Sequence, residues 1–184
     1  MARYVTRDEL IGFASKLTLD EASNLRKSIS ARSAGGSTFL SHSSKDGDLV
    51  VGATKVLENH GGRVYVDEKD PEMPPSTNEK TAELLKERIT QSKKFVLLTS
   101  KNSKESRWVP WELGFADGKK GLSNIALFPA SDYEFETEWA SWEYLGLYRR
   151  IAYGKLNGHE GDVWMVLDEK KNTADLLRTW LAGY

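Results

Sequence analysis

The sequence predicts an α/β fold in which a parallel sheet is covered by helices on both faces. Short apolar runs alternate with amphipathic helical segments from residue 38 to residue 128, and this alternation indicates repeated strand–helix–strand units. Helical connections between successive strands form right-handed crossovers, which place the strands parallel to one another. The chain has 184 residues, of which 39% are hydrophobic and 29% are charged, as expected for one globular domain of ordinary size.

The first 36 residues are expected to form two short helices ahead of this domain. Each helix begins with a capping box, in which a threonine precedes a glutamate by three residues: Thr6 with Glu9, and Thr18 with Glu21. A stretch rich in glycine and serine at 33–37 then interrupts the helical pattern. We therefore divide the chain into an N-terminal helical extension and a main domain, the latter with a core and a C-terminal elaboration: 1–36, 37–184, 37–129 and 130–184.

The core of the main domain is expected to hold four strands and three helices. The strands are the apolar runs at 38–41, 63–67, 94–100 and 124–128. Asp46 is placed to cap the first helix, and the two glycines after His60 end it. The other two helices are expected at 77–92 and 106–118, where apolar residues recur at helical spacing.

Beyond Pro129 the alternation of strands and helices weakens. The pattern there predicts a short helix and turn, an edge strand, a last strand and a terminal helix, at 139–147, 147–153, 163–167 and 173–181 respectively.

Composition argues against several classes of function. Lys and Arg number 26 against 27 Asp and Glu, so the chain lacks the basic excess of dedicated nucleic-acid binders. It has no cysteine, and its histidines (His42, His60 and His159) lack the spacing of a metal site. No apolar run has the length of a membrane helix, and the N-terminus lacks the apolar core of a signal peptide. We expect a cytoplasmic protein without metal, membrane or nucleic-acid partners.

Polar loops follow three of the expected strands, at 41–46, 67–72 and 100–103. Because ligands of parallel sheets bind outside the carboxyl ends of the strands, we expect these loops to converge on one cleft. Neither a GxGxxG nor a GxxxxGK[ST] motif occurs, so a nucleotide-dependent dehydrogenase or a P-loop ATPase is not indicated.

The helix that begins near Trp108 carries the strongest candidate for a catalytic group. Trp108, Trp111, Glu112 and Phe115 have the spacing of residues on one helical face, and only Glu112 among them is charged. A carboxylate beside flat aromatic rings can hold ribose hydroxyls or stabilise a developing cation. From the residues alone, an equally good interpretation is a solvent-exposed carboxylate that stabilises the start of the helix.

The other candidate residues each have a simple structural interpretation as well. His42 suits loop packing, and Ser43 and Ser44 suit capping of the following helix, since no base is placed to activate them. Asp67 suits a strand end and Glu72 an exposed loop.

Four segments, taken in order, resemble the sequence boxes of Toll/interleukin-1 receptor (TIR) domains in their bacterial form. They are 39–46 (FLSHSSKD), 64–67 (VYVD) with the proline-containing loop after it, 95–100 (FVLLTS) and 106–114 (SRWVPWELG). The resemblance covers the chain from about residue 37 to residue 129. It implies a flavodoxin-like fold with about five parallel strands.

The resemblance also implies an activity, because many bacterial TIR domains cleave the nicotinamide–ribose bond of NAD and release ADP-ribose or a cyclic or conjugated form of it. It assigns the catalytic glutamate to Glu112 and the carboxylate of the BB loop, which follows the second strand, to Glu72. The residues expected to contact the substrate are His42, Ser43, Ser44, Lys45, Asp67, Glu72, Trp108 and Trp111.

Standalone TIR proteins of this size resemble the sensor enzymes of Thoeris-type antiphage systems. This likeness implies NAD+ as a substrate with no separate cofactor, a homo-oligomer formed through TIR–TIR contacts, a phage-derived trigger and a downstream effector that senses the product. Two other interpretations stay open at this point: a non-catalytic TIR scaffold, and an enzyme like the nucleoside deoxyribosyltransferases.

Overall fold

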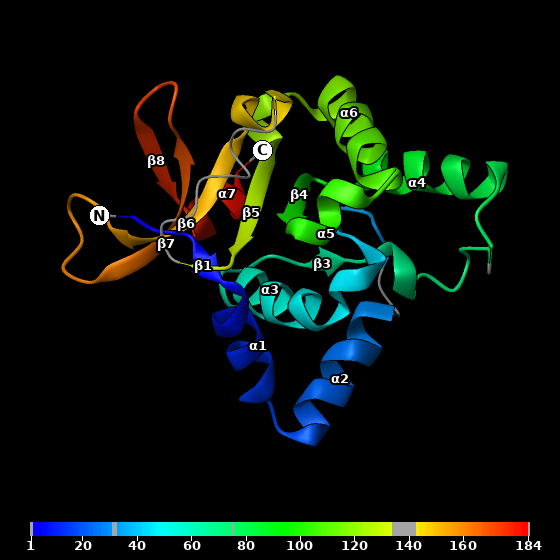
Figure 1. Ribbon diagram of the computed structural model, residues 1–184, viewed down its shortest axis with the longest axis horizontal. Coiled ribbons are helices and arrows are strands. Elements are labelled where there is room, and N and C mark those ends of the chain that lie inside the picture. The colour runs from blue at the N-terminus through cyan, green and yellow to red at the C-terminus, as the bar shows by residue number, and fades with distance from the viewer. Residues whose placement is uncertain (1, 31–32, 75, 134–142, 184) are drawn as a thin grey trace.

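A computed structural model describes residues 2–30, 33–74, 76–133 and 143–183, and in these residues eight strands form one mixed sheet (Figure 1). The strand order is β3-β2-β4-β5-β6-β7-β8, with β1 paired to β5. The strands are β1 Val5–Thr6, β2 Thr38–Ser41, β3 Val64–Tyr65, β4 Lys94–Thr99, β5 Ile125–Ser131, β6 Arg149–Lys155, β7 Asp162–Asp168 and β8 Thr173–Leu176.

Helices cover both faces of the sheet, as the sequence predicts. They are α1 Arg7–Ser15, α2 Leu19–Ser30, α3 Gly47–Asn59, α4 Glu79–Gln91, α5 Lys101–Glu105, α6 Trp108–Lys120 and α7 Leu177–Ala182. Residues of α1, α3 and α7 pack in one buried core, and residues of α4 and α6 pack in a second core on the opposite face (Figure 1).

Strand β4 shows how the sequence produces these two cores. Phe95 and Leu97 belong to the core under α4 and α6, whereas Val96 and Leu98 belong to the core under α1 and α3. Successive side chains of a strand point to opposite faces, so a run that is apolar throughout is the pattern of a strand buried on both sides. The predicted parallel sheet is confirmed for β3, β2, β4, β5 and β6, whose pairings with one another are all parallel.

The last third of the chain corrects three expectations. Strand β6 lies inside the sheet between β5 and β7, whereas an edge strand was expected there. Strand β7 is followed by one more strand, β8, which pairs antiparallel with it. The expected terminal helix at 173–181 therefore begins only at Leu177. Of the expected helix at 139–147, the structure describes a 3-10 helix at Glu143–Leu147, and residues 139–142 lie outside the described residues.

The N-terminal segment is built into the body of the fold. Strand β1 pairs with the end of β5, where Val5 lies opposite Ala130. Helix α1, which starts at the expected capping box, packs against α3 so closely that a Cβ atom on Gly52 would lie 2.1 Å from the carbonyl oxygen of Leu10. Glycine is therefore required at this crossing of the two helices. The division of the chain into units at residue 36 stays a prediction.

Within the described residues, no helix combines the length and the apolar character that crossing a bilayer requires.

Candidate active site

The centre of the candidate site is the carboxyl group of Glu112, which α6 places against the end of β2. The Ser41 hydroxyl donates a hydrogen bond of 2.5 Å to Oε2 of Glu112. Glu112 is only 4% exposed, so it does not point to solvent from the start of its helix. The neighbours of Glu112 along α6, Val109 and Leu113, are core residues, and this packing fixes the direction of the carboxylate.

The environment of Glu112 favours its protonated form. Burial raises the pKa of Glu112 well above its ordinary value, and the negative charge of Asp67 raises the pKa further. The Ser41 hydrogen bond acts in the opposite direction, because it stabilises the carboxylate. A carboxylate kept out of water in this way interacts strongly with any positive charge that forms beside it.

Asp67 and His42 accompany Glu112 at the carboxyl ends of β3 and β2. Burial raises the pKa of Asp67, and the nearby His42 partly offsets this effect. His42 is itself buried, with Nε2 3.5 Å from Oε2 of Glu68. Burial lowers the pKa of His42, but Glu68 and Asp67 outweigh this effect and raise its pKa overall. The predicted convergence of the loops after the first two strands is thus seen at Glu112.

The loop after β2 continues with two exposed residues and one buried residue. Ser43 is buried and caps a 3-10 helix at Ser44–Asp46, where its hydroxyl accepts a hydrogen bond from the backbone N–H of Lys45. Ser44 is exposed. The exposed Lys45 donates to Glu105 of α5 over 2.9 Å. Of the helix capping expected of Ser43 and Ser44, the structure shows that of Ser43, on the 3-10 helix that precedes α3.

The loop after β3 is fastened to α4 by a cluster that the sequence did not reveal. Asp70 accepts hydrogen bonds from the Tyr65 hydroxyl at 2.6 Å and from Nε of Arg88 at 2.9 Å. Arg88 also pairs with Glu72, which is otherwise exposed. The side chains of Arg88 and Asp70 are 11% and 6% exposed, so this ion pair is largely shielded from water. Glu72 is consequently directed toward α4.

The aromatic residues of α6 pack toward a different element than Glu112 does: Trp111 faces α4, whereas Glu112 faces β2. Trp108 and Trp111 meet edge to face with their centroids 5.4 Å apart, and Trp111 stacks on Phe115 at 6.0 Å. The ammonium group of Lys86, on α4, lies 5.9 Å from the centre of the Trp111 ring. The rings of both tryptophans are half-buried. The spacing therefore identified the helix correctly, but it did not show that the carboxylate faces β2 while Trp111 faces α4.

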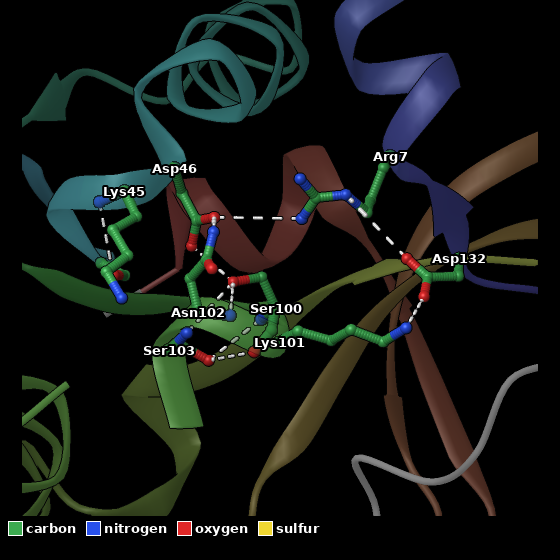
Figure 2. A network of polar contacts seen from close by, with 9 residues as sticks. Arg7, Lys45, Asp46, Ser100, Lys101, Asn102, Ser103 and Asp132 are labelled. Carbon is green, nitrogen blue, oxygen red and sulfur yellow. Dashed lines mark hydrogen bonds and ion pairs between the residues drawn. The ribbon is translucent and has the colours of Figure 1, made fainter. Parts of the chain in front are cut away.

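Asp46 corrects another expectation. It precedes α3, but its side chain makes no capping hydrogen bond to that helix. Instead its carboxylate accepts hydrogen bonds from the Ser100 hydroxyl and from the Asn102 amide of α5, and it lies near Arg7 of α1 (Figure 2). These partners are far from Asp46 in the sequence, so no local pattern indicated them. In the part of the chain that the structure describes, no cluster of His, Asp and Glu side chains suits a metal ion.

The fold and the site together define an α/β protein with a buried acidic group at the carboxyl edge of a largely parallel sheet. The family model of the TIR domain matches residues 38–162. The chain belongs to the TIR domain family, as the sequence boxes predicted.

Two curated proteins illustrate this relationship. One, from Bacillus cereus (strain MSX-D12), is named "Probable 3' cyclic ADP-D-ribose synthase ThsB'" and is 34% identical over 146 residues, which cover 78% of this chain and 74% of the relative. The other, from Cytobacillus dafuensis, is named "Putative cyclic ADP-D-ribose synthase TIR2" and is 35% identical over 81 residues, or 42% of this chain and 21% of that protein.

Proposed function

We propose that this chain is an NAD+-consuming TIR enzyme that cleaves the nicotinamide–ribose bond and closes the remaining ADP-ribose into a cyclic product. The proposal rests on the buried Glu112 carboxyl group at the carboxyl edge of the sheet, and it is supported by likeness to proteins named as cyclic ADP-D-ribose synthases. By the same likeness we propose that the product is a signal in Thoeris-type antiphage defence.

In the proposed reaction the bond between the ribose C1′ atom and the nicotinamide nitrogen breaks. Its electron pair leaves with nicotinamide, which becomes neutral, and positive charge develops on the ribose ring. The carboxylate of Glu112 stabilises this charge, because the two are close in a site with little water. A hydroxyl group of the same ADP-ribose then attacks C1′ and loses its proton, which closes the ring. Attack by water gives linear ADP-ribose instead.

The residues around Glu112 are proposed to hold the substrate. His42 lowers the pKa of Asp67 and Asp67 raises the pKa of Glu112, so we place Asp67 and His42 beside the reacting ribose in this proposal. Ser43, Ser44 and Lys45 follow along the same loop and are proposed to face the phosphates. Glu72 and Trp111, both directed toward α4, complete the proposed set together with Trp108, and the tryptophans offer flat surfaces for stacking.

The proposed enzyme works with partners. We propose a homo-oligomer formed through TIR–TIR contacts, a phage-derived trigger and a separate effector that binds the cyclic product. A non-catalytic scaffold would have no use for a carboxyl group that is costly to bury. The buried Glu112 therefore favours the enzyme over the scaffold.

Incubation of the purified full chain with NAD+ tests the proposal. It is run dilute, concentrated, with a crowding agent and with an extract of phage-infected cells that supplies the proposed trigger, and the products are separated and weighed by mass spectrometry. We expect one nicotinamide for each NAD+ consumed, together with a product lighter than ADP-ribose by one water. Linear ADP-ribose as the only product would mean that the enzyme hydrolyses NAD+ and does not form a cyclic product. No nicotinamide under any of these conditions would support the scaffold.

The pH dependence of turnover tests the state of Glu112. Because the carboxylate is the working form, kcat should fall as the pH drops through the raised pKa of Glu112. Ser41→Ala removes a hydrogen bond that lowers this pKa, so the acid limb of the kcat profile should move to higher pH. Ser92→Ala, which removes a buried hydroxyl bonded to Ile89 instead, should leave the limb in place. Identical profiles for Ser41→Ala and the wild type would contradict the assignment.

A further inference from the structure

The carboxylate of Asp46 is a buried charge that the proposed reaction does not use. Its side chain is 0% exposed, and it stands at the end of the loop that begins with Ser41 and His42. The Asn102 amide donates to Oδ1 over 2.6 Å, and the Ser100 hydroxyl donates to Oδ2. Ser100 in turn caps α5 by accepting hydrogen bonds from the backbone of Asn102 and Ser103. Asp46 thereby ties the loop after β2 to the turn after β4 (Figure 2).

A cation from the N-terminal segment reaches this carboxylate. Nη1 of Arg7 lies 3.9 Å from Oδ1 of Asp46, and Nε of Arg7 lies 4.0 Å from Oδ1 of Asp132 at the end of β5. Lys101 pairs with the other oxygen of Asp132. Figure 2 shows Arg7 extending from α1 between the two aspartates. The guanidinium therefore joins the N-terminal helix to the carboxyl edge of the sheet.

The position of Arg7 in its own helix supports this role. Arg7 is the first residue of α1, directly after the cap Thr6. A basic residue is unfavourable at this end of a helix, because the helix dipole is positive there. The helix therefore gains nothing from Arg7, whereas a buried carboxylate requires a compensating charge. The stability of α1 therefore does not explain why an arginine stands at this position, whereas the two nearby carboxylates, Asp46 and Asp132, do.

We propose that Arg7 is a positioning residue for the active site, acting through Asp46 on the loop that carries His42, Ser43 and Lys45. The effect of Arg7 on NAD+ turnover rests on the function proposed above, whereas its effect on the position of the loop does not. Helix α1 is held in place by its close contact with Gly52 of α3 and by the pairing of β1 with β5. The backbone from which the Arg7 side chain extends to Asp46 is therefore held in a fixed position.

Hydrogen–deuterium exchange tests the structural part without any substrate. In Arg7→Ala, amides of residues 42–48 and 100–104 should exchange faster than in the wild type, while those of β4 and β5 should not change. Arg7→Lys keeps the positive charge and should restore much of the protection. Lys16→Ala removes an exposed basic residue from the other end of α1 and serves as the control. Equal exchange of the loop in Arg7→Ala and Lys16→Ala would overturn the proposal.

Kinetics test the bearing on the reaction. For Arg7→Ala we expect kcat/KM to fall on the order of tenfold, mainly through a higher KM, because the loop is misplaced while Glu112 remains intact. Partial unfolding would instead lower kcat and leave KM unchanged. In an Asp46→Asn background, which has no buried charge to neutralise, Arg7→Ala should lower kcat/KM much less than it does in the wild type. An equal loss of kcat/KM in both backgrounds would show that Arg7 does not act through Asp46.

The two proposals fail in different ways. If the wild type consumes NAD+ and Arg7→Ala matches it in exchange and in kinetics, the positioning role is wrong and the proposed function stands. If the wild type releases no nicotinamide, even when it is concentrated and supplied with an extract of phage-infected cells, the proposed function is wrong, and the exchange experiment alone decides whether Arg7 fixes the loop.

Discussion

Glu112→Gln is expected to reduce NAD+ turnover by roughly a thousandfold or more. Glutamine keeps the shape of the side chain and its contact with Ser41, but it lacks the negative charge that stabilises a cationic ribose. Nicotinamide release by the purified variant measures the loss. Glu83→Gln, at an exposed position on α4, removes a carboxylate elsewhere and should retain full activity. Substantial turnover by Glu112→Gln would exclude Glu112 as the catalytic residue.

The same substitution should make the protein more stable at neutral pH. The pKa of Glu112 is raised in the folded state, so the folded protein holds this proton more tightly than the unfolded chain does. Glu112 therefore lowers stability as the pH rises, once its carboxyl group begins to ionise. Thermal unfolding at pH 5 and pH 8 should show Glu112→Gln above the wild type, with the larger gap at pH 8. A gap that widened toward acid pH would contradict the burial argument.

Gly52→Ala is expected to destabilise the fold by about 3 kcal/mol or to release α1 from α3. The added methyl group would lie 2.1 Å from the carbonyl oxygen of Leu10 and 2.7 Å from its carbonyl carbon. These are backbone atoms, which cannot turn aside as the end of a flexible side chain can. Chemical denaturation measures the free energy of unfolding, and hydrogen exchange of α1 distinguishes release of the helix from a uniform loss of stability.

Gly12→Ala provides the matched control for Gly52→Ala. Gly12 lies in α1 itself, and a Cβ atom there would meet nothing within 4 Å. Alanine favours the helix over glycine by about 0.5–1 kcal/mol, so this variant should be as stable as the wild type or slightly more so. If Gly52→Ala behaved like Gly12→Ala, the close crossing of α1 and α3 would be wrong.

The sequence was most informative where a single segment decides its own structure. The run at β4 is apolar on both faces, and this is sufficient to predict a central parallel strand. Strand β8 could not be predicted in this way, since residues 173–176 continue smoothly into the α7 pattern. They become a strand because Met165 and Asp168 of β7 pair with their two ends. Pairing with a neighbour outweighs weak local preference in such short segments.

In the candidate site, too, the sequence indicated what depends on one segment and missed what depends on contacts between segments. Glu112 was recognisable because a carboxylate among aromatic residues contradicts the pattern around it. The pairs that fix the loops, Arg7 with Asp46 and Arg88 with Asp70, were not recognisable. Their members belong to different elements, and in the sequence each looks like an ordinary charged surface residue. Only the tertiary fold brings them together.

The pairing of the N-terminal strand with distant parts of the sheet bears on how the chain is assembled during synthesis. Val5 pairs with Ala130, and Arg3 bridges to Tyr153, so neither contact exists until most of the polypeptide has left the ribosome. Until then Leu10, fully buried in the finished protein, has only part of its surroundings available. Contacts between such distant residues form slowly. The segment made first is therefore among the last to reach its place, and a nascent chain arrested before β5 would keep its own beginning exposed to chaperones and proteases.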